Sequence, residues 1–370
     1  MRIGYDAKRL FCNHRGLGNY SRDLIRILNQ YYPENHYDLF TPKIKINVPV
    51  NAENTTVIQP DGIYKYLPSS VWRSIGVCSN IKRCGDTIFH GLSQELPWGI
   101  EKTGTKNVVT MHDAIFMRYP ELYSSTYRAV FIQKNKHACR VADHIIAISE
   151  QTKRDIINFF GADEKKISVV YQGCNNIFRK QISEEQKITV RTKYNLPDQF
   201  LLNVGSIEKR KNAALIVEAL HFKKLDIPLV IIGKPTLYID EIRSLISKYK
   251  MEEQVVFIHD AETIDLPAIY SLSDMFIYPS IFEGFGIPIL EALCTSTPVI
   301  TSTGSCFEET GGPSSSYINP QSAEELGNAI SEIMNDSLLE KKMKDDGLIF
   351  SGKFTDNNIA KELMSIYQSV

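Results

Sequence analysis

Short apolar runs alternate along this chain with longer stretches in which apolar residues recur every three or four positions. The short runs predict buried strands, and the longer stretches predict amphipathic helices. In the first half, strands are expected at 1–6, 37–40, 87–90, 107–113, 142–149 and 167–171. In the second half, they are expected at 200–204, 229–232, 255–258, 275–278 and 298–300. Strands that alternate with helices predict parallel sheets, because parallel neighbours need a crossover connection.

The strand and helix series falls into two halves. A chain of 370 residues is too long for one ordinary core and favours two domains. The polar, charged stretch 180–198 separates the two series and has the composition of an interdomain connection. We therefore predict an α/β protein with an N-terminal domain over 1–180 and a C-terminal domain over 196–350. A last helix is expected within 354–370.

Composition narrows the class of protein. The formal net charge of −1 argues against a dedicated nucleic-acid binder, which would be basic. The seven cysteines form no C-x-x-C pair, so neither a zinc cluster nor a redox pair is indicated. No apolar run is long enough to span a membrane, and the N-terminus enters a strand directly, unlike a signal peptide. We expect a cytoplasmic protein with reduced thiols.

The most informative stretch runs from Glu283 to Glu291, directly after the strand expected at 275–278. Gly284 and Gly286 allow the backbone to approach a ligand closely, and Pro288 suits the first position of a helix. The N-terminus of such a helix favours a phosphate. A carboxylate at each end of this loop suits a ligand with hydroxyls at both ends and phosphate in the middle, such as a nucleotide-sugar. The alternative is a surface turn that leads into an amphipathic helix.

This stretch, with the form E-G-F-G-x-P-x-x-E-A, resembles the signature of the retaining glycosyltransferases of family 4. The resemblance covers nearly the whole chain and implies the GT-B fold, in which two Rossmann-like domains face a central cleft. It implies that the last helix crosses back to the first domain. It also implies that Glu283 holds the donor sugar near its reacting carbon, and that Glu291 binds the ribose.

Other positions match the same family in the right order. The resemblance places Gly16 and Gly18 in a loop near the donor diphosphate, and His112, at the end of a strand, against the donor sugar. Arg210 and Lys211 follow another strand, and two cations there suit a diphosphate. Ser206 stands where many relatives carry an arginine, which leaves the share of charge between the two cations open.

We thus expect two groups of site residues. The catalytic group is Glu283, His112, Arg210 and Lys211, and the donor-binding group is Gly16, Gly18, Ser206, Gly284, Phe285, Gly286, Ile287 and Glu291. No Asp-x-Asp pair stands at any expected strand end, so we expect no metal ion and no cofactor beyond the donor itself.

The segment 63–85 interleaves aromatic and aliphatic residues with Lys65, Arg73, Lys82 and Arg83. Such a stretch is able to lie on an anionic membrane surface or to hold a lipid-linked acceptor. The alternative is a helix that faces the core and has a solvated basic face. Further along, Arg118 and Tyr119 are candidates to touch the acceptor.

Together these features predict a retaining glycosyltransferase that needs no metal. Its donor would be a nucleoside diphosphate sugar, with mannose favoured, and its acceptor a saccharide or lipid-linked saccharide of a bacterial surface polysaccharide. Two alternatives remain open: a GT-B sugar-nucleotide epimerase, and an inactive nucleotide-sugar-binding protein. A dinucleotide oxidoreductase is disfavoured, because no G-x-G-x-x-G follows a strand.

Overall fold

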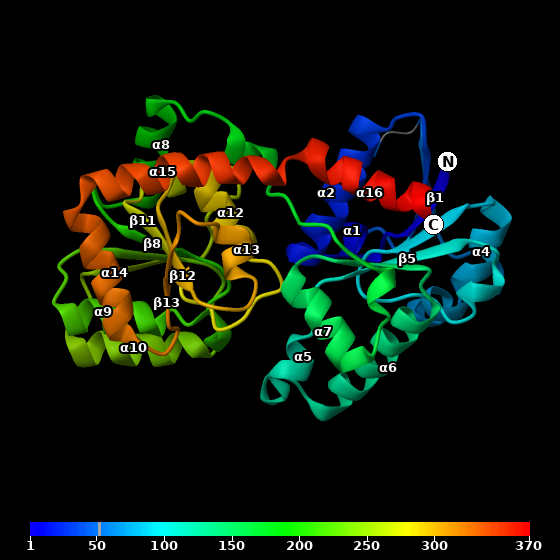
Figure 1. Cartoon of the computed structure of the whole chain (residues 1–370), viewed down its shortest axis with the longest axis horizontal. Helices are drawn as coiled ribbons and strands as arrows, with labels where there is room; N and C mark the ends of the chain where they lie inside the picture. The colour runs from blue at the N-terminus through cyan, green and yellow to red at the C-terminus, as the bar shows by residue number, and fades with distance from the viewer. Residues whose placement is uncertain (51–52) are drawn as a thin grey trace. The chain divides into compact units, whose positions relative to one another are not determined.

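The computed structural model describes residues 1–50 and 53–370, and these form two compact units. Unit 1 comprises Met1–Gln172 and Thr355–Val370, and unit 2 comprises Gly173–Phe354. Each unit is built on one sheet whose paired strands are all parallel. The predicted α/β class with two Rossmann-like domains is confirmed (Figure 1).

The sheet of unit 1 has seven strands in the order β3-β2-β1-β4-β5-β6-β7. In chain order these are β1 (Arg2–Asp6), β2 (His36–Phe40), β3 (Thr55–Ile58), β4 (Ile88–Gly91), β5 (Lys106–Met111), β6 (His144–Ala147) and β7 (Ile167–Val169). All but β3 lie where apolar runs predicted strands. Because β1, β4 and β5 are parallel neighbours, the residues that follow them meet at one edge of the sheet.

Helices cover both faces of this sheet. One core packs α1 (Lys8–Cys12), α2 (Gly16–Tyr31) and α16 (Asp356–Ser369) against it. The other packs α4 (Val77–Cys84), α6 (Ser125–Val141) and α7 (Glu150–Phe160). Two short α-helices of this unit are α3 (Ser69–Val71) and α5 (Ile115–Arg118).

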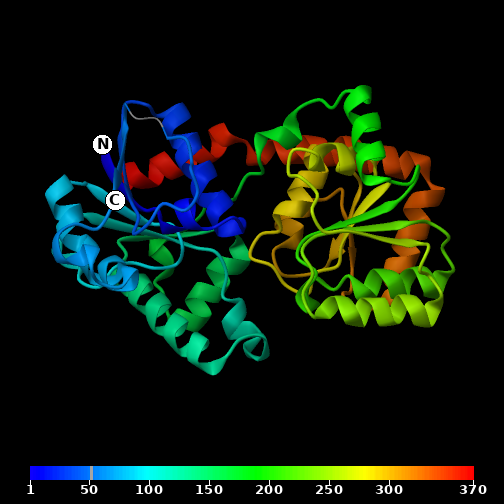
Figure 2. The ribbon, with the colours of Figure 1, turned by 180° about the vertical axis from the view of Figure 1, so that it is seen from behind.

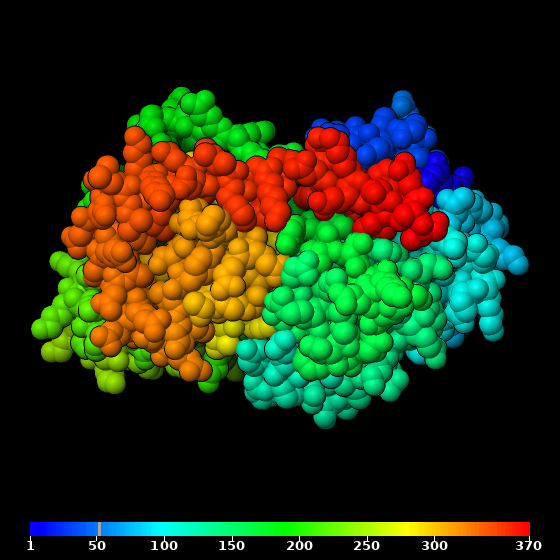
Figure 3. Space-filling view, viewed as in Figure 1, coloured from blue at the N-terminus to red at the C-terminus, as the bar shows by residue number. Residues whose placement is uncertain are grey.

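The C-terminal helix α16 is an integral part of unit 1, as predicted for the GT-B fold. It lies against α2, as the adjoining red and blue segments in Figure 3 show. Its Tyr367 hydroxyl lies 2.6 Å from Nδ1 of His90, on β4, and both side chains are buried. Burial lowers the pKa of His90 to about 3, so the neutral ring links the helix to the sheet.

The sheet of unit 2 has six strands in the order β10-β9-β8-β11-β12-β13. They are β8 (Leu201–Val204), β9 (Leu229–Ile232), β10 (Val255–Ile258), β11 (Met275–Tyr278), β12 (Val299–Ser302) and β13 (Ser316–Ile318). Here β13 alone was not predicted from the sequence.

Two layers of helices enclose the second sheet (Figure 1 and Figure 2). The main core of unit 2 lies under α9 (Ala214–Lys223), α10 (Tyr238–Tyr249) and α14 (Ala323–Asn335). The opposite side carries α8 (Glu184–Tyr194), α11 (Leu266–Leu272), α12 (Ile287–Cys294), α13 (Phe307–Gly311) and α15 (Ser337–Ser351).

The boundary between the units differs from the predicted one. The units divide between Gln172 and Gly173, whereas a connection was expected over 180–198. Within that stretch, 184–194 forms α8, which begins with a capping box between Ser183 and Gln186 and packs on α11. Its surface is polar because α8 covers the outside of unit 2, and composition alone does not separate such a helix from a linker.

Candidate active site

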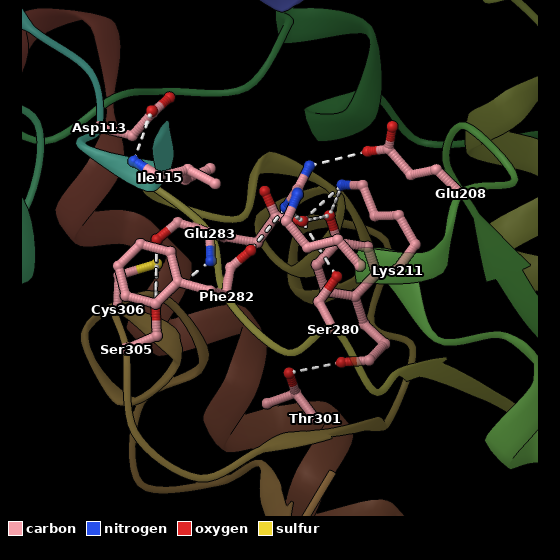
Figure 4. Close-up of polar contacts among 12 residues, drawn as sticks. Asp113, Ile115, Glu208, Lys211, Ser280, Phe282, Glu283, Thr301, Ser305 and Cys306 are labelled. Carbon is pink, nitrogen blue, oxygen red and sulfur yellow. Dashed lines mark hydrogen bonds and ion pairs between the residues drawn. The ribbon is translucent and has the colours of Figure 1, made fainter. Parts of the chain in front are cut away.

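The Glu283 carboxylate is the centre of a buried polar cluster in unit 2. Its Oε1 atom accepts hydrogen bonds from Lys211 at 2.6 Å, Tyr278 at 2.9 Å and Ser280 at 3.0 Å. It also lies 2.7 Å from a guanidinium nitrogen of Arg210. Figure 4 shows Lys211 and Ser280 converging on this carboxylate. The structure thus unites three residues that the sequence placed on two separate loops.

The parallel sheet explains this convergence. Arg210 and Lys211 lie in a 3-10 turn, Lys209–Lys211, which follows β8, and Glu283 follows β11. Because β8 and β11 are adjacent and parallel, both loops leave the same edge of the sheet. Asn212 ties them together by donating hydrogen bonds to the carbonyls of Pro279 and Pro320.

The two cations fix the charge of the cluster. Burial alone would raise the pKa of the Glu283 carboxyl, but Lys211 and Arg210 outweigh this and lower it to about 2. The same ion pairs raise the pKa of Arg210 against the effect of its burial. Glu283 is therefore an anion and Arg210 a cation at every physiological pH.

Each member of the cluster keeps polar atoms for a ligand. Within the described chain, the hydrogen bonds and ion pairs of the Glu283 carboxylate all involve Oε1, which leaves Oε2 unbound. Of the five N–H groups of Arg210, those on Nη1 reach Phe282 O and Glu283, and one on Nη2 reaches Glu208. Two N–H groups of Arg210 and one of Lys211 are then left to meet an anion.

The loop after Glu283 leads into α12 through Gly286, which is the N-cap residue with φ 96°. A side chain there would adopt a strained left-handed backbone, and its Cβ would lie 3.2 Å from Ile289. Ile287 and Pro288 form the first turn, so Pro288 is second in the helix instead of first. The helix therefore directs its N-terminus, with its partial positive charge, at the loop where Gly284 and Gly286 lie.

Glu291 lies one turn further along α12 and has a different environment. Its Oε2 accepts a hydrogen bond of 3.0 Å from the Tyr270 hydroxyl. Burial raises the pKa of Glu291 to about 7, in spite of that hydrogen bond. The two glutamates of one motif thus carry different charges near neutral pH, one fully ionised and one partly protonated.

Two predicted donor-binding side chains of unit 2, Phe285 and Ser206, lie outside the hydrogen-bonded cluster around Glu283. Phe285 is 2% exposed and packs against Phe354, with ring centroids 5.7 Å apart, and its carbonyl accepts a hydrogen bond from Thr310. Ser206 is exposed in the loop after β8.

Sequence reasoning missed several residues that hold the cluster. Tyr278 and Ser280 bind the Glu283 carboxylate, and Ser305 and Cys306 bind its backbone carbonyl at 3.0 and 3.3 Å (Figure 4). Ser305 has φ 54°, an unfavourable conformation for a non-glycine residue that often marks a functional site. Nothing in the local sequence of the loop 303–312 shows that it closes on Glu283.

The predicted residues of unit 1 lie at the carboxyl edge of its own sheet. His112 follows β5, is buried, and contacts Leu92 O at 2.8 Å through Nε2 and Gln172 at 3.2 Å through Nδ1. Burial lowers its pKa to about 4, so its ring is neutral at pH 7. Asp113 Oδ1 accepts from the Ile115 N–H and orders the next loop (Figure 4).

Gly16 and Gly18 belong to the first turn of α2, whereas the sequence suggested a loop that precedes the helix. A Cβ on Gly18 would lie 1.8 Å from the carbonyl oxygen of Asn13, so this glycine is required for packing. Gly16 is exposed, and a Cβ there would meet open space.

Among the described residues, no group of three or more His, Cys, Asp or Glu side chains is placed to hold a metal ion. In the same part of the chain, no helix is both long and apolar enough to cross a membrane.

Comparison with known protein families agrees with this architecture. Residues 15–176 match the model described as Glycosyltransferase Family 4, and residues 184–348 match the model of Glycosyl transferases group 1. The chain is a family 4 glycosyltransferase. The cluster of Glu283, Arg210 and Lys211 lies in the half that matches the group 1 model.

Relatives of this glycosyltransferase include O-antigen chain mannosyltransferase B of Escherichia coli. That protein is 26% identical over 289 residues, which cover 76% of this chain and 74% of the relative. The serotype-specific mannosyltransferase WbdA of Escherichia coli is 26% identical over 277 residues. This match covers 72% of the chain but only 33% of WbdA.

A solved structure of HepE from Anabaena, in complex with UDP-glucose, has the same fold as this chain. The TM-score is 0.76 at 17% identity, and the match covers 100% of both chains. At this identity the likeness shows the fold alone.

Proposed function

We propose that this chain transfers a sugar, most favourably mannose, from a nucleoside diphosphate to a hydroxyl of a saccharide acceptor in surface polysaccharide synthesis. The observation that carries the proposal is the Glu283 carboxylate bound through one oxygen by Lys211 and Arg210. The relatives named as mannosyltransferases support the choice of sugar, and the one named as an O-antigen chain mannosyltransferase supports the kind of pathway.

The donor would lie along the loop that joins Glu283 to α12. The remaining N–H groups of Arg210 and Lys211 would bind the diphosphate, with help from the N-terminus of α12. Oε2 of Glu283 would accept a hydroxyl of the sugar. Glu291, further along the helix, would accept the ribose hydroxyls.

The chemistry follows from these charges. As the bond from sugar to diphosphate breaks, negative charge collects on the departing phosphate, and Arg210 and Lys211 already lie there to stabilise it. No divalent metal is needed in this scheme. The acceptor hydroxyl would attack from the face that the diphosphate leaves, and a phosphate oxygen would take its proton, so the anomeric configuration is retained.

Nucleotide release from a panel of sugar nucleotides, measured with and without an acceptor extract, tests the proposal. We expect release from one guanosine or uridine diphosphate sugar, with GDP-mannose favoured, and a strong increase when the extract is added. Equal release without the extract would favour an epimerase. Binding without release would favour an inactive binding protein.

We also propose that the segment 63–85 of unit 1 contacts an anionic membrane. Five of its apolar side chains are exposed, with fractions from 36% for Val71 to 87% for Tyr66: Ile63, Tyr66, Leu67, Val71 and Ile75. Lys65 and Lys82 are exposed in the same region, whereas Arg83 is paired with Asp61 and Arg73 turns inward. Apolar groups beside unpaired cations suit an acidic lipid surface.

Sedimentation with vesicles that contain phosphatidylglycerol tests this contact. We expect binding at low salt that falls in high salt, because salt screens the lysines. The double variant Ile63→Ser with Tyr66→Ser should lose it. A matched pair in unit 2, Leu237→Ser with Ile264→Ser, removes equally exposed apolar groups and should keep it. Absence of binding at low salt would contradict the proposal.

A further inference from the structure

Two buried cysteines of unit 2 have no part in the donor chemistry above. Cys174 is the second residue of the unit, and Cys294 is the last residue of α12, the helix that carries Glu291. Their sulfur atoms lie 3.3 Å apart, although 120 residues separate them in the chain. In the part of the chain that the structure describes, this is the one contact between two cysteine sulfurs, and both thiols are free. No short spacing joins the two residues, so a sequence motif does not indicate the pair.

Both cysteines are held by packed elements of unit 2. Cys174 precedes the 3-10 turn Asn176–Arg179, which packs on α11 and α12. Arg179 fastens this turn by donating hydrogen bonds to the backbone carbonyls of Ser351 at 2.9 Å and Phe354 at 3.1 Å. The other cysteine ends a helix that packs on α15. Because both backbones are anchored, the contact between the sulfur atoms belongs to the packed unit and not to a loose loop.

The sulfur atoms are close enough to bond after a small movement. Sulfur atoms in a disulfide lie about 2.05 Å apart, so these two would approach each other by about 1 Å. Cys174 is 4% exposed and Cys294 is 6% exposed. This burial favours a small oxidant, such as hydrogen peroxide, over a bulky disulfide reagent.

The two thiols differ in acidity. The hydrogen bond with Cys174 lowers the pKa of the Cys294 thiol below its usual value, against the effect of burial, and the Arg179 guanidinium acts in the same direction. The same contact raises the pKa of the Cys174 thiol. Since the thiolate is the nucleophile in thiol chemistry, Cys294 is suited to react first and Cys174 second.

We propose that Cys174 and Cys294 are an oxidisable pair that forms a reversible disulfide, with hydrogen peroxide as the oxidant. The Cys294 thiolate attacks one peroxide oxygen and the O–O bond breaks. Cys294 becomes a sulfenic acid, and the departing hydroxide takes up the proton of the first thiol to give water. The Cys174 sulfur then attacks the sulfenic sulfur, the S–O bond breaks, and a second water leaves with the Cys174 proton. Each sulfur loses one electron, and the peroxide is reduced to two waters.

The disulfide would join α12 to the segment at which the chain enters unit 2. The two cysteines are 120 residues apart, and a bond that closes so long a loop restricts the unfolded chain strongly. Oxidation should therefore make the protein more resistant to heat, and reduction should reverse the effect.

Peptide mapping tests the bond on the original full chain. The reduced protein is treated with hydrogen peroxide, the remaining thiols are blocked with N-ethylmaleimide, and the tryptic peptides are analysed by mass spectrometry. We expect a peptide pair linked through Cys174 and Cys294, which dithiothreitol separates. The proposal is overturned if both thiols are still blocked by maleimide once the more accessible Cys12 is oxidised. Oxidation of the pair to sulfinic acids without a link would overturn it as well.

Single variants test the order of reaction. In Cys174→Ala, dimedone should trap Cys294 as a sulfenic acid, because the second thiol is missing. In Cys294→Ala, dimedone should leave Cys174 unlabelled. Cys139→Ala removes a buried thiol of unit 1 and is the matched control, which should still form the bond. Labelling of Cys174 but not of Cys294 would overturn the assigned order.

Thermal melting gives a second measure of the bond. Peroxide should raise the melting temperature of the original chain and of Cys139→Ala by about 5–10 °C, and it should leave that of Cys174→Ala unchanged. An equal change in the original chain and in Cys174→Ala would assign the effect to other oxidised groups and contradict the proposal. Neither measurement uses glycosyl transfer, so a failure of the proposed function would leave this result in place.

Discussion

At the scale of single residues, Glu283 has two roles, one toward the neighbouring cations and one toward the donor sugar. It neutralises Arg210 and Lys211, and we propose that it also orients the sugar. Its low pKa, near 2, means that it remains an anion while it does so. Removal of the carboxylate should therefore affect the two parts of the donor differently.

Glu283→Ala should lower turnover by about two to three orders of magnitude, as expected when one preorganised electrostatic group is lost. Affinity for free nucleoside diphosphate should stay equal or rise, because both cations lose an internal partner. Calorimetry and steady-state rates measure the two effects. Glu208→Ala is the control, since Glu208 also pairs with Arg210 but has no assigned contact with the sugar. A loss of nucleotide affinity in Glu283→Ala as large as the loss of turnover would contradict the assignment.

Because we propose that Glu291 binds the ribose, we expect its raised pKa, near 7, to make nucleotide binding depend on pH. Below that pH the carboxyl is protonated and is a poorer acceptor for ribose hydroxyls; above it, the carboxylate accepts them well. We expect affinity for the nucleoside diphosphate to fall as pH drops from 8 to 6, measured by calorimetry. The Glu291→Gln variant should bind the nucleoside diphosphate more weakly at pH 8. The part of the pH dependence that comes from the Glu291 carboxyl should vanish. A variant that keeps the full pH dependence would exclude Glu291 as its source.

At the scale of elements, the site depends on how α12 begins. Gly286 has a backbone conformation that other residues adopt at a cost, and the loop between Glu283 and the helix is built through it. The position of the helix N-terminus relative to the Glu283 cluster is therefore set by one glycine.

Gly286→Ala should destabilise the protein by about 1–2 kcal/mol, the cost of a left-handed conformation for an L-residue. It should also raise the KM for the donor, since the loop must shift. Gly352→Ala is a matched control: Gly352 has φ −60°, and its Cβ would meet open space. Thermal melting and donor kinetics measure both variants. Equal melting temperatures for the two would show that the loop tolerates a side chain at 286.

At the scale of the whole molecule, each unit carries a buried charge cluster at the carboxyl edge of its own sheet. The cluster of unit 2 has two cations around one carboxylate and suits a diphosphate. That of unit 1 pairs two carboxylates, Asp6 and Glu95, with two cations, Arg73 and Lys134.

Because Arg210, Lys211 and the α12 N-terminus provide the positive charge, transfer should proceed undiminished in excess chelator. The product of an α-linked donor should itself be α-linked. Proton NMR of the new anomeric signal, recorded on product made in chelator, checks both expectations. A β signal, or activity that returns only with magnesium or manganese, would overturn the proposed mechanism.

Much of this architecture was decided by the local pattern of the sequence. Apolar runs predicted eleven of the strands, because a strand that is buried on both faces must be apolar throughout. The strands that were missed, β3 and β13, lie at sheet edges, where only one neighbour supports them and the apolar signal is weak. The motif from Glu283 to Glu291 could also be recognised in the sequence, because its glycines and carboxylates lie in one continuous stretch.

Tertiary structure alone decided how side chains far apart in sequence are paired. Glu283 meets Lys211 across 72 residues, and Arg73 turns from an expected surface toward Asp6 across 67. Residues 184–194 became a helix of unit 2 because α11 lies beside them. Periodicity reports whether a position is buried, but the partner of a buried charge depends on the order of strands in the sheet. The sequence by itself therefore determined the fold and the donor motif, while the ion pairs of Arg73 and Lys211 became visible only once the strands were paired.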